Sequence, residues 1–299
     1  MLPGLGIGLL SAVLQSTSYC FSRNFVLKHP GNAWKLSVYS QLWMTGFSLL
    51  ALAVISPWQQ VTFTPKILLL AGLFGIFGNL AYFSFFRALQ LVEASRLSSL
   101  LGLKIIMLTV VNALWFRHIP DGWQGVAILL SALAAVGMNF SGGRIPYQGG
   151  IFLGITLGCF AITDILAAEM VAAMPGNSLL LRSVASTGLS FGVLGIVSSL
   201  AFFRMKFERD CMRDAFGYGI CWFTAMIGLL ASFNLLGVLL ANIVQAGRGF
   251  FSVLLGALLL KCGFAGLEPP VSRKIWLRRG IMALLMILSM VLYMKGLAS

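Results

Sequence analysis

Long apolar runs, each about the length of one membrane crossing, dominate this sequence. A helix needs about 20 consecutive apolar residues to cross the hydrocarbon core of a bilayer. Apolar segments of this kind follow one another along the chain, at about 3–22, 35–56, 66–87, 94–116, 122–140, 150–172, 178–203, 216–236, 239–260 and 275–294. Only short breaks rich in Pro, Gly or charge separate them. The sequence therefore predicts an all-α integral membrane protein with ten transmembrane helices and no soluble domain.

The composition supports the same class of protein. Of the 299 residues, 59% are hydrophobic and 10% are charged, whereas soluble domains carry about 25% charged residues. The net charge of +13 does not indicate affinity for nucleic acid, because the cations gather at the ends of the apolar segments. We therefore expect membrane lipids as surroundings and no nucleic-acid partner.

The residues that usually carry metal or nucleophilic chemistry are scattered. The sequence contains no CxxC pair and no HExxH or GxSxG motif. It therefore predicts no disulfide framework, no metal site, no cofactor and no enzyme. The residues concerned are Cys20, Cys159, Cys211, Cys221, Cys262, His29 and His118.

The two halves of the chain resemble one another. A shift of about 147 residues places FFRALQLVEASRLSSLLGLKIIML over ASFNLLGVLLANIVQAGRGFFSVLL, and each has a break before a long apolar run. A stripe of small residues in the first segment, Gly4, Gly8 and Ala12, is matched by Gly150, Gly154 and Gly158 in the sixth. Because five crossings per copy is an odd number, the second copy enters the membrane inverted. We predict two inverted five-helix repeats, over 1–140 and 150–299.

Both halves carry the pattern of a known family. The first copy reads FFRALQLVEASRLSSLLGLKIIMLTVVNALWF followed by GWQGVAILLSALAAVGM. The second copy reads FNLLGVLLANIVQAGRGFFSVLLGALLL and RRGIMALLMILSMVLYM. Together these runs resemble the drug/metabolite transporter superfamily, in its ten-span members with two EamA-type repeats. The resemblance implies a secondary active transporter in the cell membrane, the bacterial inner membrane. It also implies a central cavity lined by spans one, three, four, six, eight and nine.

Two cations lie inside the predicted helices. Lys104 is near the middle of RLSSLLGLKIIMLTVVNALWF, and Arg248 is near the middle of the ninth segment. A charge at the bilayer centre costs about 2.5–3.5 kcal/mol on insertion scales, so it persists mainly beside protein or a watery cavity. The repeat places Arg248 over position 101, on the helical face of Lys104. We interpret the two as binding groups for an anionic substrate, the guanidinium being suited to carboxylate or phosphate.

The alternative is that carboxylates inside the protein neutralise these cations. Asp164 and Glu169 both lie in the sixth predicted helix. They are five residues apart and so point about 140° apart, which predicts that only one of them faces the cavity. Asp164 is also the candidate carrier of a coupling proton, since burial raises the pKa of a carboxyl group in general.

Polar and aromatic residues of three further helices are candidates to complete a mixed binding pocket. Each of them is also an ordinary packing residue when taken alone. The candidates are Gln15, Ser16, Ser18 and Tyr19 in the first segment, Asn79, Tyr82 and Phe86 in the third, and Trp222, Phe233 and Asn234 in the eighth.

Within transport we expect export of a small amphipathic metabolite such as an amino acid. The alternative is a carrier or flippase of a phosphorylated solute or lipid-linked phosphate held by Lys104 and Arg248. A membrane-embedded structural or receptor protein is the alternative outside transport.

Most Lys and Arg residues flank the odd-numbered connections, whereas Lys66, Arg117 and Lys295 lie on the opposite side. The positive-inside rule then predicts that both termini lie outside the cytoplasm.

Overall fold

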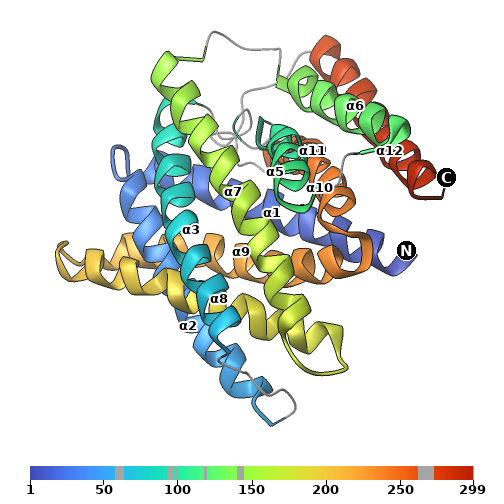
Figure 1. Cartoon of the computed structure of the whole chain (residues 1–299). Coiled ribbons are helices and arrows are strands. Elements are labelled where there is room, and N and C mark those ends of the chain that lie inside the picture. The colour runs from blue at the N-terminus through green and yellow to red at the C-terminus, as the bar shows by residue number, and fades with distance from the viewer. Residues whose placement is uncertain are drawn as a thin grey trace.

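The chain folds as a bundle of helices in the computed structural model (Figure 1), which describes residues 1–57, 64–92, 97, 100–117, 120–139, 145–261 and 273–298. No strand occurs within these ranges. Two of the scattered residues named above, Cys262 and His118, lie outside the described residues. The elements are α1 (Leu2–Lys28), α2 (Ala33–Ile55), α3 (Pro65–Leu91), η1 (Leu101–Leu103), α5 (Lys104–Phe116), α6 (Gly122–Asn139), α7 (Tyr147–Ala173), α8 (Leu179–Phe203), α9 (Arg209–Leu236), α10 (Val238–Ala246), α11 (Arg248–Lys261) and α12 (Arg273–Ala298).

The lengths of these helices suit a protein that crosses a membrane several times. Seven of the described helices are long and apolar enough to span: α1, α2, α3, α7, α8, α9 and the Gly280–Leu297 part of α12. The apolar stretches Leu101–Leu114 and Gly122–Gly137 are shorter. These spans establish an all-helical, multi-pass membrane protein.

The fourth and ninth apolar segments each contain a tightened turn of helix. The short 3₁₀ helix η1 runs directly into α5, and a single turn at Gly247 joins α10 to α11. The first of these turns is closely packed, because a Cβ atom added to Gly102 would lie 2.8 Å from that of Ala135 in α6. Lys104 and Arg248 are each the first α-helical residue after such a turn.

The helices of the two halves pack in pairs. The most extensive contacts join α1 to α9, α3 to α7, α2 to α8 and α6 to α12. The four pairs remain the same set when each helix is exchanged for its counterpart in the other half of the chain. The counterparts are α1 and α7, α2 and α8, α3 and α9, and α6 and α12. Each pair therefore combines one helix from the first half of the chain with one from the second.

The α2 and α8 backbones approach closely. A Cβ atom added to Gly195 of α8 would overlap the Thr45 side chain of α2. The Thr45 hydroxyl donates to the Gln41 carbonyl at 2.7 Å and to the Phe191 carbonyl at 3.3 Å, and the Ser198 hydroxyl donates to the Gln41 side chain. Small residues at such contacts let membrane helices pack tightly.

Leucine at Gly195 is expected to lower the free energy of unfolding by about 1–3 kcal/mol, because overpacking forces neighbouring side chains to move. The matched control is Gly192→Leu in the same helix, where an added Cβ atom meets nothing within 4 Å. We expect only Gly195→Leu to lower the thermal unfolding midpoint in detergent. Equal midpoints for the two variants would show that the α2–α8 contact contributes little.

Ion pairs join the first connection of the chain to the start of α9. Lys28 Nζ lies 3.4 Å and His29 Nε2 3.0 Å from the Asp214 carboxylate, while Lys35 Nζ lies 2.6 Å from Glu208 Oε1. The hydrogen bond from Lys35 holds the pKa of the Glu208 carboxyl below its ordinary value. These contacts place the connections after α1 and after α8 at the same end of the bundle.

Candidate functional site

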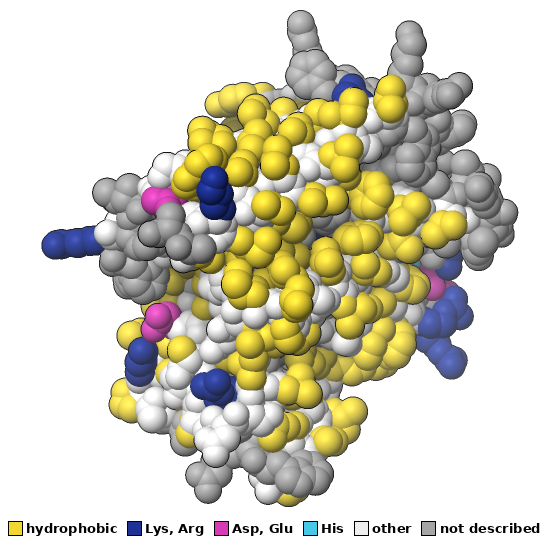
Figure 2. All heavy atoms as spheres, turned by 90° about the vertical axis from the view of Figure 1, so that its right-hand side faces the viewer, with side chains coloured by type: hydrophobic (Ala, Val, Ile, Leu, Met, Phe, Trp, Pro, Cys, Tyr) yellow, Lys and Arg dark blue, Asp and Glu magenta, His cyan; other side chains and the backbone are white. Residues whose placement is uncertain are grey.

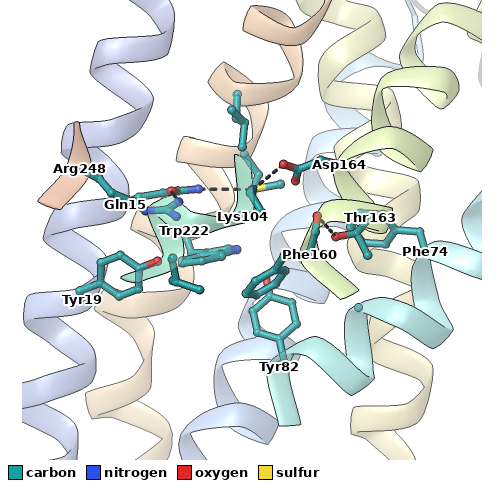
Figure 3. A pocket seen from close by; sticks show the side chains of 14 residues that line it. Gln15, Tyr19, Phe74, Tyr82, Lys104, Phe160, Thr163, Asp164, Trp222 and Arg248 are labelled. Carbon is teal, nitrogen blue, oxygen red and sulfur yellow. Dashed lines mark hydrogen bonds and ion pairs between the residues drawn. The ribbon is translucent and has the colours of Figure 1, made fainter. Parts of the chain in front are cut away.

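A small pocket lies at the centre of the bundle, where six of the predicted spans meet (Figure 3). Side chains from α1, α3, the η1–α5 unit, α7, α9 and α11 line it. These are spans one, three, four, six, eight and nine, the set implied by the family resemblance. The lining residues are Gln15, Tyr19, Phe74, Gly78, Tyr82, Leu101, Lys104, Phe160, Thr163, Asp164, Trp222, Met226, Leu229 and Arg248.

The pocket is closed in this conformation. Its volume is about 20 Å³, whereas a single water molecule needs about 10–15 Å³ measured in the same way. Water fits there and a metabolite does not. A transport cycle through this site therefore requires the surrounding helices to separate.

Lys104 and Asp164 form a buried ion pair. Lys104 Nζ donates to Asp164 Oδ2 at 2.5 Å, and the two residues are only 6% and 4% exposed. Glu169, the other candidate acid, instead pairs with Lys66 at 3.2 Å with both side chains partly in solvent. Of the two acids, only Asp164 is among the residues that line the pocket. The structure also shows the internal neutralisation that was the alternative reading of Lys104.

Arg248 is buried without a carboxylate. It is 4% exposed, and its Nη1 atom donates to Gln15 Oε1 at 3.0 Å. Its Nε atom is buried with no hydrogen-bond partner. Among the described residues, no acidic side chain lies within ion-pair distance of this guanidinium. The Ser16 hydroxyl donates to the Arg248 backbone carbonyl at 2.8 Å and ties the start of α11 to α1.

The charges of the pocket do not balance. Two cations, Lys104 and Arg248, share it with the single carboxylate of Asp164. With all three groups ionised, the described lining carries one uncompensated positive charge. An uncompensated charge in the membrane interior is costly, so the pocket is suited to a ligand with one negative group.

Aromatic rings form one wall of the pocket. The Trp222 ring centroid lies 5.8 Å from that of Tyr19, 5.8 Å from that of Tyr82 and 6.3 Å from that of Phe160. Tyr19 Oη and Trp222 Nε1 are buried without hydrogen-bond partners. The wall thus offers apolar surface together with two unused polar groups, a combination typical of small-molecule sites.

The structure brings together most, but not all, of the residues that the sequence singled out. Gln15, Tyr19, Tyr82, Lys104, Asp164, Trp222 and Arg248 line the pocket. Asn79 instead donates to the Gly75 and Leu194 carbonyls, and Asn234 is exposed near the end of α9. Neither asparagine is among the lining residues. Arg182 lies in the first turn of α8 and is not a lining residue.

The sequence interpretation did not name seven of the lining residues, which are Phe74, Gly78, Leu101, Phe160, Thr163, Met226 and Leu229. Phe160 lies one helical turn before Asp164 and Gly78 one turn before Tyr82, so each shares a helical face with a predicted lining residue. That spacing was the signal that would have identified these two. Within the described residues, no group of three or more His, Cys, Asp or Glu side chains could hold a metal ion.

Comparisons with known proteins agree with this architecture. The sequence model of the EamA-like transporter family matches residues 2–140. One solved structure, described only as "Crystal structure of protein", covers 98% of this chain and 96% of its own at a TM-score of 0.63 and 14% sequence identity. At this level of sequence identity, the comparison supports a shared fold and nothing further. No curated protein matches the sequence.

Proposed function

Since residues 2–140 belong to the EamA-like transporter family, we propose that this membrane transporter of the drug/metabolite type exports a small amphipathic metabolite with one anionic group. The observation that carries the proposal is Arg248, buried with no carboxylate among the described residues. A carboxylate bound to its guanidinium would balance the charge of the pocket. The aromatic wall would then contact the apolar part of the same molecule. An amino acid is one metabolite with these features.

The proposed architecture comprises ten spans in two inverted repeats, 1–140 and 150–299. The symmetric set of helix pairs supports it, as does the matching placement of Lys104 and Arg248, each directly after a tightened turn in the fourth or ninth span.

Asp164 is the proposed carrier of a coupling proton. Its carboxylate faces the pocket and pairs with Lys104 alone among the described residues. When the pair with Lys104 opens on one side of the membrane, the Asp164 carboxylate would take up a proton. It would release that proton on the other side, when Lys104 pairs with it again. One proton would then move opposite to each substrate molecule.

A phosphorylated solute, or a lipid-linked phosphate, is the second candidate. The presence of Lys104 and Arg248 in one pocket favours it, because phosphate groups are commonly bound by both types of cation. The carboxylate reading is preferred because Asp164 already pairs with Lys104. Among the described residues, the pocket therefore has one cation without a carboxylate, which suits a single negative charge.

The proposed location is the bacterial inner membrane, with both termini outside the cytoplasm. The support is the gathering of Lys and Arg on the side of the odd-numbered connections. Lys28 and Lys35 flank the first of these connections and meet acids at the start of α9, beside the seventh. A reporter active only in the cytoplasm, fused to the C-terminus, should stay inactive.

Binding to purified protein in lipid nanodiscs tests the function. The panel pairs each amino acid with its methyl ester and its decarboxylated amine, and adds phosphorylated sugars. We expect heat of binding from the amino acids and none from partners that lack the carboxylate. Binding of esters and amines as strong as that of the acids would overturn the role of Arg248. Binding of phosphorylated compounds alone would favour the second candidate.

A further inference from the structure

A second and much larger hollow opens on the outside of the bundle, between α1, α11 and α12. Its volume is about 1080 Å³, and its lining is almost wholly apolar, with Leu9, Phe250, Leu284 and Met290 among the contributing side chains. We call it the α12 groove. Figure 2 shows the side of the molecule on which α12 lies, and hydrophobic side chains cover most of that face.

The α12 groove runs along the least buried of the seven candidate spans. The spanning part of α12 is only 22% buried, whereas the other six candidate spans are 39–61% buried. Leu277 and Met294 mark the ends of the groove along α12, so the groove is about 25 Å long at 1.5 Å per residue. One leaflet of the hydrocarbon core is about 15 Å thick. An alkyl chain that extends through one leaflet therefore fits along the groove.

One structural feature borders both hollows. At the turn between α10 and α11, Gly247 lines the α12 groove and the next residue, Arg248, lines the central pocket. Leu9 of α1 lines the groove, and Gln15, less than two turns further along the same helix, accepts a hydrogen bond from Arg248. The buried guanidinium without a carboxylate thus lies next to the wall of an apolar groove.

This juxtaposition narrows the substrate, given the function proposed above. We propose that the central site binds a single-chain amphiphile with a carboxylate head, which enters from the lipid so that its head lies on Arg248 and its alkyl chain lies in the α12 groove. Charge complementarity at Arg248 selects the head group. Burial of each methylene group tightens binding by roughly fourfold, so affinity should rise with chain length up to the length of the groove.

The test uses dodecanoate with a photoreactive diazirine at its terminal carbon, on the full-length protein in nanodiscs. Light should attach the label to peptides of α11 and α12. Excess dodecanoate should abolish the labelling, and dodecylamine should not. Arg248→Gln should reduce labelling more than tenfold, because the head group loses its cation.

A matched pair of variants separates the groove from the rest of the surface. Gly280 lines the groove, and a Cβ atom added there meets nothing within 4 Å. Gly280→Phe should place a bulky side chain in the groove and abolish labelling. Gly72→Phe on α3, where the space around an added Cβ atom is equally open, should leave labelling unchanged.

The outcomes distinguish this inference from the proposed function. If short carboxylates bind through Arg248 but chain length has no effect on affinity, the proposed function stands and the groove inference is wrong. Labelling that persists in Arg248→Gln would show that the groove holds ordinary lipid chains, which also overturns the inference. If neither short nor long carboxylates bind, both proposals are wrong.

Discussion

Arg248→Gln is expected to weaken binding of a carboxylate substrate by about 30-fold to several thousandfold. Removing one partner of a buried charge pair costs about 2–5 kcal/mol, and the substrate carboxylate has no other unpaired cation in the described lining. Folding should not suffer, because the substitution removes a buried charge that lacks a carboxylate. Calorimetric titration and the thermal unfolding midpoint, measured on the same preparation, check both expectations.

The control for this variant is Arg182→Gln. Arg182 is half-buried, and its Nε atom also lacks a hydrogen-bond partner, but it lies in the first turn of α8 and outside the pocket. Binding should be unchanged in this variant. If Arg182→Gln weakened binding as much as Arg248→Gln, the effect would come from total charge and not from the pocket.

Breaking the Lys104–Asp164 pair is expected to destabilise the fold. Lys104→Met and Asp164→Leu, made singly, should each lower the free energy of unfolding by about 3–5 kcal/mol, since each leaves an unpaired charge in the interior. The double variant should recover most of that loss, because two apolar side chains of similar size replace the pair. Thermal unfolding and the yield of monodisperse protein measure the cycle.

Transport by the double variant tests whether the pair does more than stabilise. Uptake into proteoliposomes under an imposed pH gradient should be lost, although the protein folds, because the proposed proton carrier is absent. The matched control is Lys66→Met with Glu169→Leu, which removes a surface pair. Gradient-driven transport by a well-folded Lys104→Met, Asp164→Leu protein would show that the pair is purely structural.

The sequence located the central residues because few polar groups are tolerated inside apolar segments. Lys104, Arg248 and Asp164 stand out for that reason, and helical geometry alone separated Asp164 from Glu169. The ion pair itself was one of several pairings that the sequence allowed. The choice depends on how α5 and α7 pack, which no local pattern encodes.

The tightened turns at η1 and at Gly247 were not predictable from hydrophobicity, because the apolar runs continue through them. The positions of Asn79 and Asn234 outside the pocket were not predictable either. A polar side chain in a membrane helix can be satisfied by a nearby carbonyl, as Asn79 is, and only the structure shows which polar residues reach the cavity.

The uncompensated charge in the pocket makes the protein sensitive to the membrane potential. An empty pocket with Lys104 and Arg248 protonated and Asp164 ionised carries one net positive charge. A charge that crosses the whole field changes in free energy by about 2.3 kcal/mol per 100 mV. In the proposed cycle a monoanionic substrate would cancel that charge, so the loaded protein would reorient with little response to voltage. The empty protein would return with that charge and with the coupling proton, so its return would be the electrically sensitive step.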